Sequence, residues 1–232
     1  MIEDCKFYYP ITEELLPYGV ATDPYWGAGE FKYLNASPWH VIGPEGTVKV
    51  DTINPYVGHH TPEIQLPGNG TAAGIIQDEL AVVNGKKYIG KIILAGNNEA
   101  LPIMVRLVLD NGEVLNQQIE NINSTFQSFP LEFEAPESSN TIKIEFISSG
   151  KGKFRIGTIS LMPADNIKGW RKDVVALLKE LNSPIYRWPG GNFVSGYKWQ
   201  DCIWKRDKRP PQKIRPGKVW NIMMLVSMNI WN

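Results

Sequence analysis

The segment from Arg187 to Tyr197 holds the side chains whose types and spacing best suit chemistry on a polar ligand; it reads RWPGGNFVSGY. Gly190 and Gly191 allow a tight turn that brings the backbone close to a bound molecule. Arg187 offers a fork of N–H donors, and the amide of Asn192 both donates and accepts hydrogen bonds. This pair suits the hydroxyls of a neutral polyol, and an arginine can also hold a catalytic carboxylate in place. An equally weighted alternative is that Arg187 pairs with a core carboxylate while the glycines only close a turn.

A helix and a strand must position this segment, and both are predicted just before it. Residues 164–182 read ADNIKGWRKDVVALLKELN, with apolar residues at i, i+4, i+7, i+8 and i+11, which predicts one buried helical face. That face consists of Trp170, Val174, Leu177, Leu178 and Leu181. Asp165 or Asn166 is the expected N-cap, and Pro184 follows the expected end.

The next residues, 183–188, read SPIYRW and predict a short buried strand. A helix followed by a buried strand is typical of an α/β barrel or a doubly wound sheet. One such unit cannot bury both faces of a sheet. Residues 164–212 therefore predict an incomplete piece of such a domain.

Residues 37–163 show a different pattern, typical of a mainly β fold. Apolar and polar residues alternate in short segments such as MVRLVL and TIKIEF, with no helical period between them. The Asn84-Gly85 pair and Asp110-Asn111-Gly112 predict tight turns between successive strands. Short, evenly spaced strands predict a β-sandwich or jelly roll. Residues 1–36 are rich in Pro, Gly and aromatics, and predict a loop-rich lead-in.

Aromatic residues are abundant: the chain has eight Trp, nine Tyr and eight Phe. Four of them could form a sugar-stacking surface on the predicted sandwich: Tyr25, Trp26, Trp39 and Tyr56. Core or inter-domain packing is the favoured alternative for the same four residues.

Bulk composition excludes several classes of protein. The 232 residues include 24 basic and 24 acidic side chains, so general electrostatics favour neither a nucleic-acid partner nor an acidic membrane. Cys5 and Cys202 lie far apart, which predicts neither a disulfide framework nor a metal site. The His59-His60 pair has no ligand-spaced neighbours, so we expect no metal and no cofactor. The start, MIEDCKFYYP, is not a signal peptide, and no apolar run is long enough to span a membrane.

Residues 160–212 closely resemble the family 51 α-L-arabinofuranosidases, above all through RWPGGNF and the helix before it. The EDCKFYYPI start resembles the segment after that family's first barrel strand, in a bacterial branch with a jelly roll inserted there. The resemblance implies a retaining glycosidase with a (β/α)8 barrel and a carbohydrate-binding-like jelly roll. It also implies an arabinose-containing oligo- or polysaccharide as the partner, and a true start upstream of Met1.

By the same resemblance, Arg187 corresponds to the family's active-site arginine and Asn192 to its substrate-binding asparagine. The family's two catalytic glutamates lie on later barrel strands, and no Asp or Glu here lies in a matching motif. Retaining hydrolysis needs two carboxyl groups about 5 Å apart. We therefore expect no catalytic residue in this chain and no activity from the chain alone. The family's Asp-Gly-Ile-Gly pattern is also altered, to Asp-Cys-Ile-Trp at residues 201–204.

Residues 213–232 match nothing in the family and end in the Met- and Trp-rich VWNIMMLVSMNIWN. A permitted codon string for this tail, read two bases later, gives EYNDVGINEYME, close to a family motif. We therefore expect an out-of-frame tail, in preference to a membrane anchor or a partner helix. Two alternatives to an enzyme fragment stay open: a stand-alone carbohydrate-binding sandwich, and a non-functional product of a broken gene.

Overall fold

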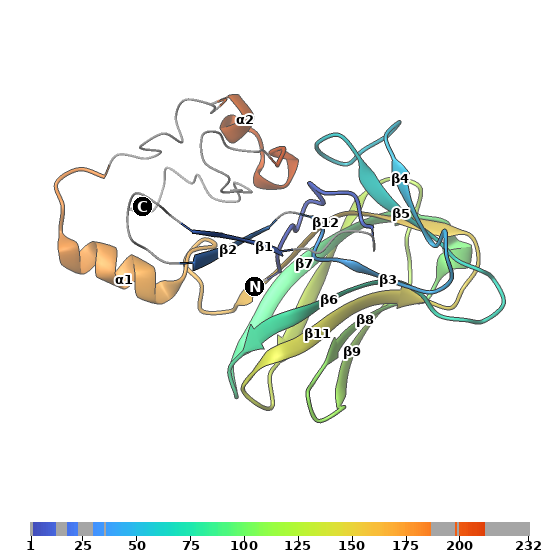
Figure 1. Cartoon of the computed structure of the whole chain (residues 1–232), viewed down its shortest axis with the longest axis horizontal. Helices are drawn as coiled ribbons and strands as arrows, with labels where there is room; N and C mark the ends of the chain where they lie inside the picture. The colour runs from blue at the N-terminus through green and yellow to red at the C-terminus, as the bar shows by residue number, and fades with distance from the viewer. Residues whose placement is uncertain are drawn as a thin grey trace.

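Two five-stranded antiparallel sheets packed face to face make up most of the protein, and the helices lie to one side of them (Figure 1). The computed structural model describes residues 2–12, 18–22, 30–34, 36–186, 198 and 200–211. This arrangement is a β-sandwich, and it confirms the mainly β prediction.

The first sheet has the order β10-β7-β12-β5-β4 and the second has the order β3-β6-β11-β8-β9. Strand neighbours are mostly not consecutive in sequence, so the chain repeatedly crosses between the sheets. The bounds of the first are β10 Gln127–Glu134, β7 Lys87–Gly96, β12 Lys153–Pro163, β5 Thr61–Gln65 and β4 Val48–Asp51. Those of the second are β3 His40–Ile42, β6 Ala73–Val82, β11 Ser139–Ser148, β8 Ile103–Val108 and β9 Val114–Ile119.

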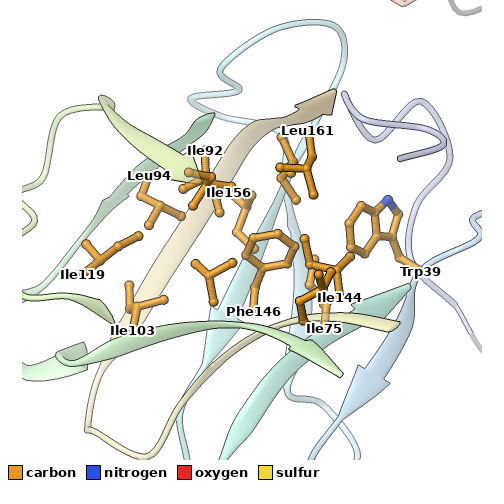
Figure 2. Packing of buried hydrophobic residues seen from close by; sticks show 14 of the residues in the cluster. Trp39, Ile75, Ile92, Leu94, Ile103, Ile119, Ile144, Phe146, Ile156 and Leu161 are labelled. Carbon is orange, nitrogen blue, oxygen red and sulfur yellow. The ribbon is translucent and has the colours of Figure 1, made fainter. Parts of the chain in front are cut away.

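The space between the sheets is filled by one apolar cluster. Alternate residues along each strand point inward, as in β8, where buried and half-buried positions alternate. Figure 2 shows this packing around Phe146, Ile75 and Ile156, all of which are fully buried. Burying apolar surface is the main favourable term in folding, so this cluster is the main source of the sandwich's stability.

The two predicted tight turns are confirmed. Lys86 N donates to Val83 O at 3.1 Å, and Gly85 takes a φ of +71°. Between β8 and β9, Gly112 N donates to Leu109 O at 3.0 Å, and Gly112 has a φ of +85°. Positive φ is readily adopted by glycine, which explains why these dipeptides mark the turns in the sequence.

Two strand glycines are required by close backbone contact. An added Cβ on Gly74 in β6 would lie 1.9 Å from Phe146 O, and one on Gly90 in β7 would lie 1.9 Å from Ser160 O. Backbone atoms cannot move aside as a flexible side chain can. No other residue type fits at these two positions.

The lead-in contributes to the sandwich although it was predicted to be loop-rich. Phe7 is 2% exposed and belongs to the core cluster, with its ring 5.6 Å from that of Trp39. The lead-in also contains an antiparallel hairpin, β1 Tyr18–Thr22 and β2 Glu30–Leu34, that the sequence analysis missed.

The helix α1 spans Lys172–Leu181, a later start than predicted. Its N-cap residue is Arg171, so the prediction of Asp165 or Asn166 as the N-cap was wrong. The side chain of Asn166 instead accepts a hydrogen bond from Gly169 N at 2.7 Å, which closes a separate turn before the helix.

The predicted buried face of this helix is only partly buried: Trp170, Val174 and Leu178 are half-buried, and the other two residues are exposed. Leu177 and Leu181 are 64% and 69% exposed, whereas Val175, outside the predicted face, is 1% exposed. The buried strand predicted over 183–188 is absent from its described part: 183–186 form no strand, and Ile185 is 78% exposed. A strand needs neighbours to pair with, and the described chain provides none here. Two short helices follow, α2 Gln200–Ile203 and η3 Arg206–Lys208.

Candidate functional site

The four residues predicted to bind substrate, Arg187, Gly190, Gly191 and Asn192, lie outside the described residues. Tyr25 and Trp26 of the predicted stacking surface also lie outside them. Their roles stay predictions. The structure does place the other two aromatic residues and the segments on either side of the sandwich.

Trp39 lies in the core and not on a sugar-stacking surface. Its side chain is 0% exposed, its ring centroid is 5.9 Å from that of Phe146, and its indole nitrogen donates to Asp4 O at 3.3 Å. A fully buried ring has no face to offer a sugar. In this structure Trp39 therefore packs in the core, as the alternative to sugar stacking predicted.

Tyr56 is half-buried at the junction between the sandwich and the segment 200–211. Lys208 Nζ lies 3.6 Å from the centroid of its ring and donates to Tyr56 O at 2.9 Å. The Phe126 ring is 5.0 Å away, and a Cβ on Gly157 would lie 2.5 Å from Tyr56 Cγ. Tyr56 thus packs against both the sandwich and Lys208, and its role in sugar stacking stays a prediction.

Residues 2–9 bind strands of both sheets. Cys5 O accepts hydrogen bonds from Ile159 N at 3.0 Å and Thr158 Oγ1 at 2.8 Å, both on β12. Glu3 N donates to Gln77 Oε1 at 2.9 Å on β6, and Gln77 Nε2 donates back to Glu3 O at 3.0 Å. Residues 2–9 are therefore an integral part of the sandwich.

Lys6 ties residues 2–9 to the segment 200–211. The residue is 3% exposed, and its ammonium donates to Arg206 O at 2.6 Å and to Arg209 O at 2.7 Å. Beside it, Lys91 on β7 forms an ion pair with Asp207 at 2.5 Å. The contacts of Lys208 with Tyr56 add to these. Two segments about 200 residues apart in sequence thereby meet on one face of the sandwich.

Burial shifts the pKa values of several groups in residues 2–9, among them Asp4 and Lys6. Burial raises the pKa of the Asp4 carboxyl to about 7, even though hydrogen bonds from Tyr8 N and Tyr9 N favour its charged form. Burial also lowers the pKa of the Lys6 ammonium to about 8. Since desolvation disfavours charge in both cases, each group is held in place at an electrostatic cost.

Lys6→Met is expected to release the segment 200–211 from the sandwich. Each hydrogen bond from a charged donor is worth about 1.5–3 kcal/mol, so local opening should become at least roughly tenfold more frequent. Trypsin should then cleave faster after Lys205 and Lys208. Lys143→Met, which removes an exposed lysine on β11, is the matched control. Equal cleavage rates in the two variants would show that Lys6 does not hold this segment.

A hollow of about 770 Å³ lies between one end of the sandwich and α1. Apolar side chains form most of its wall, including Leu80, Val82 and Ile142. Its rim carries the exposed ion pair of Lys86 with Asp165, at 3.4 Å. Asn166, Arg171, Lys172 and Asp173 also line the hollow, so polar side chains adjoin its mostly apolar wall.

None of the described helices is long and apolar enough to cross a membrane. Within the same part of the chain, no three His, Cys, Asp or Glu side chains gather as a metal ion would require.

Short stretches of the chain are similar to known arabinofuranosidases. The exo-α-(1→6)-L-arabinofuranosidase of Bifidobacterium longum is 54% identical over 48 residues, which are 21% of this chain and 9% of that protein. The intracellular exo-α-(1→5)-L-arabinofuranosidase 1 of Bacillus subtilis is 52% identical over 48 residues, 21% of this chain and 10% of that protein. The probable α-L-arabinofuranosidase C of Aspergillus terreus is 47% identical over 58 residues, 25% of this chain and 11% of that protein. The matches thus span about a tenth of the length of these curated relatives, and this chain shares partial homology with them.

Solved carbohydrate-binding modules have a similar arrangement of strands. A family 16 module has a TM-score of 0.40 at 15% identity, over 51% of this chain and 89% of that one. The xylan-binding CBM22-1 domain of Paenibacillus barcinonensis Xyn10C has a TM-score of 0.42 at 12% identity, over 55% and 86%. The sandwich assignment depends on the two sheets themselves and not on these likenesses. No model of a protein family matches the chain.

Proposed function

We propose that this chain is part of a family 51 α-L-arabinofuranosidase, an enzyme that releases terminal α-L-arabinofuranosyl groups from arabinan or arabinoxylan. The observation that carries the proposal is the local identity of about 50% to several arabinofuranosidases. In this proposal residues 37–163 are the inserted sandwich. Residues 164–212 supply a helix, and the strand and loop after it, to a (β/α)8 barrel.

The exposed apolar stripe on α1 supports this assignment. Leu177 and Leu181 are four residues apart on the helix and are both more than 60% exposed. A helix that packs on a parallel sheet presents such a stripe to the strands. The described chain has no barrel sheet to cover it, which is what a barrel helix without its remaining strands would show.

Arg187 and Asn192 are the proposed substrate-binding residues, on a turn made by Gly190 and Gly191. On a (β/α)8 barrel, loops at the C-terminal ends of the strands line the active site. There the guanidinium and the amide would hydrogen-bond sugar hydroxyls and orient a catalytic carboxylate. Retaining hydrolysis further needs an acid/base and a nucleophilic carboxylate, which later strands of the whole enzyme would supply. Residues 213–232, in the same proposal, are an out-of-frame tail.

The chain alone should release no arabinose from a chromogenic arabinofuranoside above background. The general acid and the nucleophile supply most of the rate, and Arg187 and Asn192 cannot replace them. A chimaera tests whether residues 160–211 belong to the barrel. In it, these residues replace the equivalent segment of the Bacillus subtilis enzyme. We expect the chimaera to turn over the substrate.

The outcomes separate the parts of the proposal. Robust turnover by the purified 232-residue chain would contradict the assignment of the catalytic carboxylates to a missing part. A chimaera that folds but is inactive would contradict the assignment of residues 160–211 to the barrel.

A further inference from the structure

A polar cleft of about 490 Å³ lies on the first sheet where β4, β5 and β12 adjoin. Ile64 on β5 and Phe154 on β12 are 0% exposed and face the core. Because side chains alternate along a strand, their neighbours face outward, and Lys49, Glu63 and Arg155 form a row across the three strands. The cleft is therefore on the outer face of the sandwich.

Arg155 is fixed in the cleft by two separate segments, residues 51–54 and residues 124–126. Its Nη1 donates to Asp51 Oδ2 at 2.9 Å and to Asn54 O at 3.4 Å, and its Nη2 donates to Ser124 O at 3.2 Å. The guanidinium also lies 4.8 Å from the centroid of the Phe126 ring. A side chain held in this way loses little conformational entropy when a ligand binds.

Asp51 is fixed in the same manner. Its Oδ1 accepts hydrogen bonds from Ile53 N at 2.9 Å and Asn54 N at 3.2 Å. Burial acts to raise the pKa of this carboxyl, but these hydrogen bonds and Arg155 outweigh burial and hold the pKa below its ordinary value. The carboxylate and the guanidinium are 15% and 18% exposed, so both still reach the cleft.

The charges of the cleft nearly cancel. Asp51 pairs with Arg155, and Glu63 pairs with Lys153 at 2.8 Å, which leaves Lys49 as the one further charged side chain of the lining. Each pair sets strong donors beside strong acceptors. A hydroxyl group both donates and accepts, so adjacent hydroxyls can bridge such pairs, whereas a strongly charged ligand gains little net attraction.

We propose that this cleft binds a neutral saccharide chain. Asp51, Arg155 and Asn54 would hydrogen-bond the hydroxyls, and Ile53 at the rim, which is 86% exposed, would contact the C–H face of a ring. The volume is within the range of about 300–1,000 Å³ typical of small-ligand sites. The choice of an arabinose-containing chain as the first ligand rests on the proposed function. The proposal of a saccharide site rests on the residues of the cleft alone.

The test is a titration of the ¹⁵N-labelled 232-residue chain, followed by amide chemical shifts. The probes are an arabino-oligosaccharide, a xylo-oligosaccharide and, as a charged competitor, an oligogalacturonide. We expect a neutral probe to shift amides of residues 51–54, 63, 124 and 153–155. Loss of a charge-assisted hydrogen bond should make Arg155→Met raise Kd roughly tenfold or more, and loss of a neutral one should make Asn54→Ala raise it about two- to tenfold.

Asn54→Ala covers the case in which Arg155→Met weakens the fold, because the Asn54 side chain is exposed. Asn116→Ala, an exposed asparagine on β9 of the other sheet, is the matched control and should leave Kd unchanged. Shifts that fall elsewhere, no shift with either neutral probe, or binding of the oligogalacturonide alone would overturn the proposal. None of these outcomes depends on catalysis. The chimaera can therefore be inactive while the cleft binds a saccharide, and the cleft can fail to bind while the chimaera is active.

Discussion

Gly90→Ala and Gly74→Ala are each expected to cost more than about 4 kcal/mol of the free energy of unfolding, a loss that few single substitutions reach. The new Cβ would lie 1.9 Å from a backbone carbonyl oxygen in both cases. Relief would require two neighbouring strands to separate and break their shared hydrogen bonds. Since folded domains are stable by only about 5–15 kcal/mol, much of either variant should be unfolded. Urea unfolding followed by circular dichroism measures the effect.

Gly70→Ala is the matched control. Gly70 has a φ of +85°, and an added Cβ there would meet nothing within 4 Å. This variant carries only the backbone cost of a left-handed residue, about 1–2 kcal/mol. If Gly90→Ala were no more destabilising than Gly70→Ala, the close approach of β7 and β12 described above would be incorrect.

Arg187→Ala and Asn192→Ala, each made in the active chimaera, are expected to lower kcat/KM about 10- to 100-fold while leaving the fold intact. Losing a charge-assisted or buried hydrogen bond costs roughly 1.5–3 kcal/mol, which corresponds to one to two decades in rate. Kinetics on a chromogenic arabinofuranoside and the melting temperature should be measured on the same preparations.

The alternative for Arg187 predicts the opposite pattern. If Arg187 only pairs with a core carboxylate, its removal leaves a buried charge and costs about 3–5 kcal/mol of stability. A large loss of stability, with unchanged kinetics in the folded fraction, would therefore refute a role in substrate binding. Lys198→Ala, an exposed residue near the same loop, is the control for both measurements.

The sandwich could be predicted from the sequence because its signals are local. Alternation along β8 and β11, together with the turn residues Gly85 and Gly112, depends only on neighbouring residues. The burial of residues 2–9 could not be predicted in this way. Phe7 lies in the core next to Cys5, whose carbonyl oxygen accepts a hydrogen bond from β12, and that contact spans more than 150 residues.

The helix and the strand after it were predicted less well for a physical reason. Periodicity gives the face of α1 that is apolar, but not whether a partner covers it. Leu177 and Leu181 fit the pattern and are nevertheless exposed. The N-cap prediction failed because Asn166 stabilises a turn of its own, with Lys168 and Gly169 at positive φ, before the helix begins.

The polar cleft gave no signal in the sequence. Its lining residues come from four strands and three loops. Asp51 is 104 residues from its partner Arg155. Charged residues on strands usually indicate a solvated face, and the sequence pattern cannot distinguish such a face from a cleft. Only the register of β4, β5 and β12 brings these side chains together.

The hydrogen bonds between Cys5 and β12 place the start of the described chain near the end of the last strand of the sandwich. They attach the chain entering the sandwich at Thr158 and Ile159, and β12 ends at Pro163. At about 3.3 Å per residue, four to five residues of strand separate entry from exit by roughly 15 Å. Residues 2–9 therefore meet the sandwich close to the point where β12 ends. A substitution that loosens the end of β12 would also loosen residues 2–9.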